Sequence, residues 1–196
     1  MLLKDYVFWK QAIPPHICDQ FIKYGKQQEV ESGRIGKDRG RTKKEVRDSD
    51  IGWINAKWVW DWILEPVNIA NRDIFKYNIG EVEDIQFTKY STGQFYDWHM
   101  DIKEDEPFNI NNNYCRKLSL IIPLSAPSEY EGGEIEFRSL HSSPDGKYAP
   151  PLLSKDAFKE QGTMLIFPSI IWHRVKPVTK GTRHSLVAWW GGPFFT

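Results

Sequence analysis

Short apolar runs recur through the second half of the chain and are separated by turn-forming residues. The runs read KLSLIIPL, GGEIEF, GTMLIFP, IIWHRV and HSLVAWW, and Pro-, Gly- and Ser-rich segments lie between them. Before them, Ile85, Phe87 and Tyr90 lead through a glycine-containing turn into FYDWHMD, which indicates two more strands. A series of this kind is typical of an antiparallel β-barrel or of a jelly-roll-like pair of sheets.

The first part of the chain has helical rather than strand periodicity. Pro14 and Pro15 stand just before HICDQFIKYGKQQ, whose apolar residues fall near a 3.6-residue period. A proline in the first turn of a helix removes no hydrogen bond, so the sequence predicts a helix that begins here. We expect this helix to pack on the outside of a sheet.

A second helical pattern extends from Ile54 to Phe75 and is interrupted by Pro66. Proline inside a helix bends or ends it, so two helices or one bent helix are predicted against the sheet. The residues at roughly helical intervals are Trp58, Val59, Trp62, Ile63, Ile69 and Ile74.

The segment ESGRIGKDRGRTKKEVRDSD separates the two helical patterns. It contains three glycines and few apolar residues, and seven Lys or Arg residues lie between Arg34 and Arg47. This composition predicts an exposed charged loop. The functional alternative is a lid or a docking strip for an acidic or extended substrate.

The segment Ile170–Trp190 has apolar runs on either side of Pro177 and Gly181, which is interpreted as a β-hairpin. His173 lies near the end of the first predicted strand and Arg183 near the start of the second. Folding of the hairpin would bring an imidazole and a guanidinium towards one region. This pair indicates a metal ligand beside an anion-binding group.

Size and charge limit the remaining possibilities. The 196 residues suit a single domain, with a helical part over about 1–80 and a β core over about 81–196. Lys plus Arg and Asp plus Glu both total 26, so net charge favours neither a nucleic-acid nor a membrane partner. No apolar stretch approaches the ~18 residues of a membrane span, and two cysteines are too few for a disulfide framework. We therefore expect a soluble cytoplasmic protein with free thiols, whose oligomeric state the sequence leaves open.

A candidate metal site begins at His99 and Asp101. Residues i and i+2 of a strand face the same side, so these two side chains can bind one ion while Met100 points away. His173 can supply a third ligand, because strands distant in sequence become neighbours in a jelly roll. Two histidines and one carboxylate leave positions open and suit non-haem Fe(II) and oxygen chemistry. Zinc is the alternative metal.

Arg183 favours iron over zinc. A guanidinium binds a carboxylate through two parallel hydrogen bonds, and an apolar strand is an unfavourable place for arginine unless an anion meets it. A hydrolytic zinc site has no evident need for such a group. An oxygenase that uses 2-oxoglutarate does, because one end of this dicarboxylic acid can chelate iron while the distal carboxylate is neutralised elsewhere. Ser185 faces the same side as Arg183 and can add a hydrogen bond.

Several segments together resemble the Fe(II)- and 2-oxoglutarate-dependent dioxygenases of the prolyl 4-hydroxylase-like branch. They are QFTKYSTGQFYDWHMD, RKLSLIIPLS, YEGGEIEF and GTMLIFPSIIWHRVKPVTKGTRHSLVAWW, covering about Gln86 to Trp190. The upstream VRDSDIGWI and the Trp-rich helices also resemble microbial and phage members of this branch. The resemblance implies a fold that is mainly β with N-terminal helices and a double-stranded β-helix (jelly-roll) core.

The resemblance also implies a role for each site residue. It assigns His99, Asp101 and His173 as iron ligands and Arg183 as the group that binds the distal carboxylate. It further implies that Tyr90 reaches a carboxylate of 2-oxoglutarate and that Trp189 lines the pocket. Pro123 stands where some oxygen-sensing relatives have a tyrosine that helps to hold the distal carboxylate, which gives Arg183 and Ser185 more weight.

The implied activity is the oxidative decarboxylation of 2-oxoglutarate by O2, which yields succinate and CO2 and hydroxylates a substrate. Ascorbate is a candidate reductant. The expected substrate is a residue in a peptide or protein, with proline as the first choice. The alternatives are a free amino acid or other small molecule, or a non-catalytic metal-binding interaction module. In the pattern of the superfamily's nucleic-acid dealkylases, a second arginine follows the first by six residues. This chain has Trp189 at that position, which counts against nucleobase repair.

Overall fold

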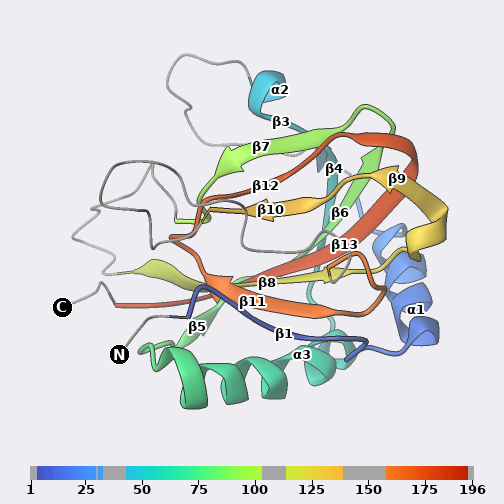
Figure 1. Cartoon of the computed structure of the whole chain (residues 1–196). Helices are drawn as coiled ribbons and strands as arrows, with labels where there is room; N and C mark the ends of the chain where they lie inside the picture. Colours follow the sequence, from blue (N-terminus) through green and yellow to red (C-terminus); the bar gives the residue numbers. More distant parts are fainter. Residues whose placement is uncertain (1–3, 30, 33–42, 103–113, 139–157, 194–196) are drawn as a thin grey trace.

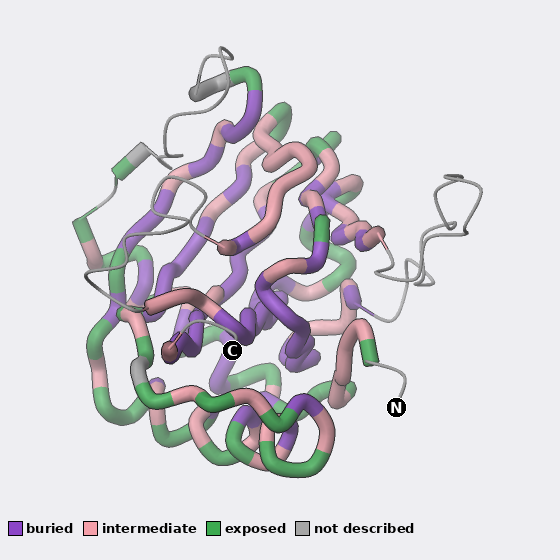
Figure 2. The backbone as a smooth tube through the Cα atoms, turned by 90° about the vertical axis from the view of Figure 1, so that its left-hand side faces the viewer, coloured by how far each residue is buried: buried purple, intermediate pink, exposed green. Residues whose placement is uncertain are grey.

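Two antiparallel sheets face each other, and two helices cover the outer side of the larger sheet (Figure 1). The computed structural model describes residues 4–29, 31–32, 43–102, 114–138 and 158–193. Within these residues, most of the buried positions lie along the strands, and the exposed positions lie on the outer turns of the helices and at strand ends (Figure 2). The jelly-roll-like pair of sheets predicted from the sequence is confirmed.

The larger sheet contains nine strands. Its main path, in order across the sheet, is β1 (Val7–Trp9), β11 (Met164–Pro168), β8 (Cys115–Pro123), β13 (Val178–Gly192), β6 (Ile85–Ser91), β4 (Asp50–Ile54) and β2 (Glu31–Ser32). Two short strands, β5 (Glu81–Val82) and β9 (Tyr130–Gly132), pair with β13 outside this path. The long strand β13 therefore connects most of the sheet.

The smaller sheet has the strand order β10 (Ile135–Phe137), β12 (His173–Val175), β7 (Phe95–His99) and β3 (Arg47–Asp48). The helical elements are α1 (Pro15–Gly25), α2 (Lys43–Val46), α3 (Lys57–Ala70), the π-helical turn η1 (Asn71–Phe75) and the 3-10 turn η2 (Pro127–Glu129). The N-terminal part, which was expected to be helical, thus also contributes strands to both sheets.

Alternation along the strands divides the apolar residues between two cores. One core lies between the larger sheet and the helices and includes Leu118, Leu120 and Leu186. The other lies between the two sheets and includes Phe137 and Phe167. Since successive residues of a strand point to opposite faces, the residues of β13 from Arg183 to Trp189 alternate between the inter-sheet space and the helix side.

Helix α1 begins where the sequence predicts. Pro15 is its first residue, and the carbonyl oxygen of Pro14 accepts backbone hydrogen bonds from Ile17 and Cys18. Its apolar face, with Phe21 fully buried, packs against the larger sheet. Both cysteines of the chain are free thiols.

Helix α3 is the single helix of the two predicted alternatives, but it starts later than predicted. It continues through Pro66 to Ala70 without a break, and Ile54 belongs to β4 rather than to the helix. The buried stripe is formed by Val59, Ile63 and Val67, while Trp58 and Trp62 are 36% exposed. The two tryptophans lie one position away from the stripe and rest at its edge. In the described part of the chain, no helix has the length and hydrophobicity needed to cross a membrane.

The predicted hairpin over Ile170–Trp190 is wrong. Strand β12 belongs to the smaller sheet and β13 to the larger, so the segment around Pro177 crosses from one sheet to the other (Figure 1). The backbone N–H of Lys176 donates to Glu134, and that of Val178 donates to Gln94, rather than to each other's strand.

Gly181 lies inside β13 rather than in a turn. Its φ of +76° is in the left-handed region that favours glycine. A Cβ at this position would lie 2.1 Å from the carbonyl oxygen of Glu129, so a side chain would force β9 away from β13. The glycine that was interpreted as a turn signal therefore serves the close pairing of two strands.

The charged segment before β4 is also only partly as predicted. Residues 33–42 lie outside the described residues, and the segment then forms α2 and β3. Arg47, expected in an exposed loop, is only 7% exposed and pairs through its backbone with Tyr96 of β7. Pairing with the smaller sheet turns this side chain inwards, which composition alone does not indicate.

His184 lies on the helix side of β13, next to Arg183 in sequence but on the opposite face. Its ring stacks on Phe87, and its Nδ1 lies 3.0 Å from the hydroxyl of Ser125. Its Nε2 is buried and has no partner within the described part of the chain. Burial, together with the charges of Lys26, Lys89 and Arg183, lowers the pKa of His184 to about 4. The folded protein therefore holds this imidazole in its neutral form.

We predict that His184 makes the protein less stable in mild acid. Because its pKa is lowered on folding, the stability it contributes is present above the unfolded-state pKa of about 6.5 and is lost as the pH falls towards about 4. Relative to His184→Gln, the wild-type free energy of unfolding should fall by about 2 kcal/mol between about pH 7.5 and about pH 5. Urea unfolding at both pH values measures this, with the exposed His16→Gln as control. Equal pH dependence of wild type and His184→Gln would contradict it.

Candidate metal centre

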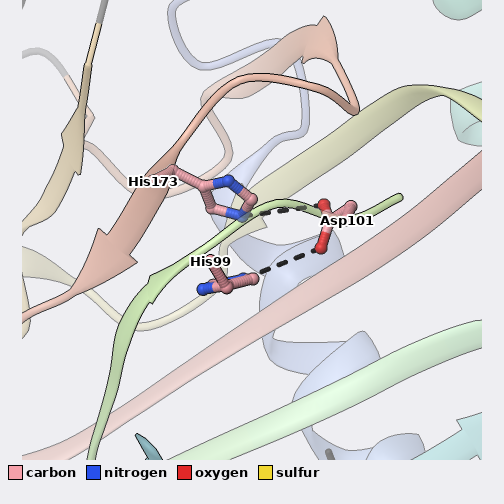
Figure 3. A group of neighbouring side chains, drawn as sticks. All are labelled: His99, Asp101 and His173. Carbon is pink, nitrogen blue, oxygen red and sulfur yellow. Dashed lines mark ion pairs between the residues drawn. The ribbon is translucent and has the colours of Figure 1, made fainter. Parts of the chain in front are cut away.

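Three potential metal ligands converge in the space between the sheets (Figure 3). His99 is the last residue of β7 and His173 the first of β12, and the register of the two strands places them directly opposite each other. Asp101 follows β7 by two residues. One ligand atom from each residue lies within 4.8 Å of those of the other two. The sequence predicted this grouping, although Asp101 lies beyond the strand rather than in it.

Both imidazoles present Nε2 to the centre of the group. Nδ1 of His99 lies 2.8 Å from the carbonyl oxygen of Asp97, and Nδ1 of His173 lies 2.9 Å from that of Ile171. A carbonyl oxygen can only accept, so Nδ1 carries the proton in each ring. The Nε2 lone pair is then left for a ligand, as metal-binding histidines require.

The carboxylate of Asp101 is held by a chain of two serines. The Ser119 hydroxyl donates to Oδ2 of Asp101 at 2.7 Å, and the hydroxyl oxygens of Ser119 and Ser169 are 3.0 Å apart. The proton of Ser119 is used on the carboxylate, so Ser169 must donate to Ser119. The backbone carbonyl of Ser169 also accepts the N–H of Asp101 at 2.9 Å. Ser169 precedes His173 by four residues, so one turn positions two of the three ligands.

Charge in the group favours a cation. Burial and the neighbouring charge of His173 lower the pKa of His99 well below its ordinary value, so this ring is neutral at neutral pH. Burial alone would raise the pKa of Asp101, but His173, His99, Arg116 and the Ser119 hydrogen bond outweigh it and lower the pKa to about 2. A neutral His99 and an ionised Asp101 are the forms in which these two side chains bind a divalent metal.

The distances within the group also fit a shared ion. Nε2 of His99 is 3.7 Å from Oδ1 of Asp101, and Nε2 of His173 is 3.6 Å from Oδ2. These separations are too long for hydrogen bonds and close to those between ligand atoms that each lie about 2.0–2.2 Å from one metal. The donor set of two histidines and a carboxylate fits Fe(II) with open positions, and the residues could equally hold zinc.

Arg183 lies on the inner face of the larger sheet. It is 2% exposed, and its Nη1 donates to the hydroxyl of Ser185 at 3.1 Å. Its Cζ lies 5.5 Å from the centroid of the Tyr90 ring, which β6 presents from the neighbouring strand position. Among the described residues, no carboxylate pairs with this guanidinium. Arg183, Ser185 and Tyr90 thus lie next to one another, and their role in binding 2-oxoglutarate stays a prediction.

Trp189 borders the same space at the other end of β13. Its ring lies under the guanidinium of Arg116, 3.9 Å from Cζ to the ring centroid. Arg116 forms an ion pair with Glu83, and its Nη1 donates to the carbonyl oxygen of Asp101 at 3.4 Å. Arg116 therefore connects Trp189 to the backbone of Asp101, one of the candidate metal ligands.

Sequence reasoning missed several residues of this site. Tyr96 stacks on the His99 ring with centroids 3.4 Å apart, and Cζ of Arg47 lies 4.6 Å from the centroid of the Tyr96 ring. Ser119 and Arg116 lie in a segment that carries the family resemblance, but the sequence indicated no role for either. The i, i+3 spacing of Tyr96 and His99 puts them on opposite faces of a regular strand, and only the register shift between β7 and β12 brings them together. Nothing in the local sequence indicated Arg47.

The fold and these residues together define a jelly-roll protein with a metal site between its sheets. Residues 85–191, more than half of the chain, match the family model described as the 2OG-Fe(II) oxygenase superfamily. The chain therefore belongs to the 2OG-Fe(II) oxygenase superfamily.

Curated relatives carry the description PKHD-type hydroxylase. One from Gloeothece citriformis (strain PCC 7424) is 32% identical over 110 residues, which cover 56% of this chain and 43% of that protein. Another from Prochlorococcus marinus (strain MIT 9211) is 32% identical over 147 residues, which cover 73% of this chain and 55% of that protein. The chain spans about half the length of the curated relatives it matches.

Solved structures with the same fold include prolyl hydroxylases. A viral collagen prolyl hydroxylase from Paramecium Bursaria Chlorella virus-1, described as a 2OG complex, has a TM-score of 0.66 and 20% identity and covers 96% of this chain and 97% of that chain. A prolyl hydroxylase from Trichoplax adhaerens, in complex with a hypoxia inducible factor peptide fragment, has a TM-score of 0.67 and 16% identity, covering 95% and 83%. At these identities the likeness is one of fold.

We predict that the serine chain strengthens metal binding. Removing the hydroxyl that holds a ligand carboxylate typically weakens metal affinity by about 10- to 100-fold, so Ser119→Ala should raise the dissociation constant for Mn(II), a stand-in for Fe(II), by this factor. Ser119→Thr keeps the hydroxyl and should bind nearly as well as wild type. Calorimetric titration measures both, with Ser91→Ala as a control serine on β6. An unchanged Mn(II) affinity in Ser119→Ala would refute this role.

Proposed function

We propose that this protein is an Fe(II)- and 2-oxoglutarate-dependent dioxygenase that hydroxylates an unactivated C–H bond and releases succinate and CO2. His99, Asp101 and His173 hold the iron in this proposal, and Arg183 with Ser185 binds the distal carboxylate of 2-oxoglutarate. Membership of the 2OG-Fe(II) oxygenase superfamily implies Fe(II), 2-oxoglutarate and O2. We include ascorbate as a reductant that keeps the metal in the Fe(II) state.

The observation that carries the proposal is that the His/Asp/His group and Arg183 face the same inter-sheet space. A hydrolytic zinc centre would explain the triad but not a buried guanidinium that has no carboxylate partner among the described residues. Burying an unpaired charge costs several kcal/mol unless an ion pairs with it. A dicarboxylic acid that bridges the metal and Arg183 accounts for both features.

The protein side chains have separate tasks in this proposal. Arg183 and Ser185 set the position of the co-substrate from its distal end, and Tyr90, which lies beside Arg183, contributes a hydroxyl to a co-substrate carboxylate. Trp189 closes the pocket near the metal and helps to exclude water. The bound iron and co-substrate supply the oxidising chemistry, so no protein general base is required.

We further propose a peptide or protein substrate, with proline as the hydroxylated residue. Support comes from the relatives described as PKHD-type hydroxylases and from the prolyl hydroxylases of similar fold, one of which is in complex with a peptide fragment. The hydroxylation of a free amino acid or another small molecule is the alternative. The residues that contact the substrate beyond the reacting carbon determine which of these two substrate classes the enzyme accepts.

We predict that the purified protein converts 2-oxoglutarate to succinate when Fe(II), ascorbate and O2 are supplied. Replacement of a ligand in His99→Ala, Asp101→Ala or His173→Ala removes a metal–protein bond and should reduce succinate to the background without metal. Mass spectrometry or NMR measures succinate, with the exposed His16→Ala as a matched histidine control. Absence of succinate from wild type, or equal yields from His99→Ala, would exclude the proposed activity.

A second prediction concerns Arg183. Loss of a buried charged partner typically costs about 2 kcal/mol or more, so Arg183→Met should raise the KM for 2-oxoglutarate by about 30-fold or more. Because the iron ligands are untouched, Mn(II) affinity should remain within about threefold of wild type. If KM for 2-oxoglutarate stayed the same in Arg183→Met, the distal carboxylate would have to bind elsewhere.

The substrate proposal is tested by incubating the enzyme with proline-containing peptides and with free proline. Hydroxylation adds the mass of one oxygen atom to the substrate, and fragmentation locates it. Addition to a prolyl residue in peptides supports the peptide proposal, whereas addition to free proline alone supports the small-molecule alternative.

A further inference from the structure

Arg47 is a second buried guanidinium on the inner side of the sheet pair. Its side chain enters from β3, and only 7% of the residue is exposed. Nε donates to the hydroxyl of Ser49 at 2.8 Å. Among the described residues, no carboxylate pairs with it, and its two terminal nitrogens have no hydrogen-bond acceptor.

The arrangement of Arg47 repeats that of Arg183. In both cases an arginine donates to a serine two residues later, Arg47 to Ser49 and Arg183 to Ser185, and both members of each pair are buried. One pair starts from the smaller sheet and the other lies on the larger sheet. A serine that holds one nitrogen fixes the plane of the guanidinium and leaves the remaining nitrogens for a ligand.

Contacts place Arg47 close to the candidate metal ligands. Its Cζ lies 4.6 Å from the centroid of the Tyr96 ring, and that ring stacks on His99 at 3.4 Å. After burial, the charge of Arg47 is the first neighbouring charge that acts on the pKa of Tyr96, and the same charge acts on His99. The guanidinium therefore belongs to the surroundings of the metal centre rather than to the outer surface.

The terminal nitrogens of Arg47 remain open to a ligand. In the part of the chain that the structure describes, the fully buried side-chain polar atoms without a partner are Nε2 of His184 and Nε1 of Trp189. The terminal nitrogens of Arg47 are not among them although no described residue accepts from them, so the described protein atoms do not enclose them fully. They are therefore available to an anion of the substrate.

Arg47 is also the unbalanced charge of the site. Arg116 is neutralised by Glu83, and Arg183 is neutralised by the co-substrate if the proposed function holds. A buried cation without a counter-ion destabilises the protein. A bound anionic ligand would pair with Arg47 and offset this cost. The ligand that completes the site must then bring a negative charge to Arg47.

We propose that Arg47 and Ser49 form a carboxylate subsite for the substrate, so that the enzyme selects a residue with a carboxylate directly beside the carbon that is hydroxylated. The identification of the ligand as the substrate that is hydroxylated rests on the proposed function. The subsite itself follows from the geometry of Arg47. The carboxylate can be the α-carboxylate of a terminal or free amino acid, or the side chain of an adjacent acidic residue.

A carboxylate suits the site better than a larger anion. With Nε occupied by Ser49, Nη1 and Nη2 present two parallel donors that match the two oxygens of a planar carboxylate. A single negative charge balances a single guanidinium. The ring of Tyr96 lies under the guanidinium and prevents a second layer of oxygens on that side.

The test compares ligands that differ only in this charge. The Mn(II)-loaded full chain is titrated, with 2-oxoglutarate at saturation so that Arg183 is occupied, with N-acetylproline against N-acetylprolinamide and with Ac-Pro-Asp-NH2 against Ac-Pro-Asn-NH2. We expect at least one charged ligand to bind about tenfold or more tightly than its neutral partner, which corresponds to about 1.4 kcal/mol. The first pair reports an α-carboxylate and the second an acidic neighbour.

Variants of the subsite decide whether Arg47 causes the preference. In Arg47→Met the ratio of the two dissociation constants should fall to within about twofold of one, and Arg47→Lys, which keeps charge but not the paired donors, should give an intermediate ratio. Arg72→Met removes an exposed guanidinium and should leave the ratio unchanged. If Arg47→Met does not fold, Ser49→Ala keeps the arginine, frees its Nε and should also reduce the ratio.

A ratio near one for both pairs in wild type, or the same preference in wild type, Arg47→Met and Ser49→Ala, would overturn the carboxylate subsite. Failure of the proposed function has a separate signature, because it appears as an absence of 2-oxoglutarate binding and of succinate formation. The ligand ratios are measured with Mn(II) and require no turnover, so the two failures are distinguishable.

Discussion

Polar groups buried between two sheets must find partners there, and this constraint governs the centre of the molecule. Asp101 illustrates it, because its carboxylate accepts from Ser119, its N–H donates to Ser169, and its carbonyl oxygen accepts from Arg116. In surroundings of low dielectric each of these bonds is stronger than in water, and each unpaired group costs more. The network therefore fixes one position for a carboxylate that comes after the end of its strand.

The chemistry of the site follows from that position. With Nδ1 of both histidines donating to backbone carbonyls, the two Nε2 atoms and the Asp101 carboxylate meet from two adjacent strands and the bend that follows one of them. The register between β7 and β12 places the two histidines opposite each other. The turn before His173 holds Asp101 through the hydrogen bond from its N–H to Ser169. Metal binding thus needs little rearrangement of the chain, since the ligands and their supports are already in place.

Three arginines surround this centre, and their partners distinguish them. Arg116 forms an ion pair with Glu83 and donates to the backbone of Asp101. Arg183 and Arg47 each donate a hydrogen bond to a serine and have no carboxylate partner among the described residues. The proposed roles follow from this difference: a structural ion pair, a co-substrate site and a substrate site. In these proposals one serine-held guanidinium orients the co-substrate and another orients the substrate.

The sequence by itself determined the fold class, the helix that begins after Pro14 and the His99, Asp101 and His173 set. Strand alternation and proline at a helix start are local properties, so they could be predicted. The ligand set could be predicted from the metal chemistry of its side chains, although His173 lies far from the other two in sequence. Tertiary structure alone decided that Trp58 and Trp62 lie at the edge of the buried stripe, that β12 and β13 lie in different sheets, and that Arg47 turns inwards. Each of these depends on which distant strand supplies the hydrogen bonds and the covering surface, and Arg47 became a site residue only when β3 paired with β7.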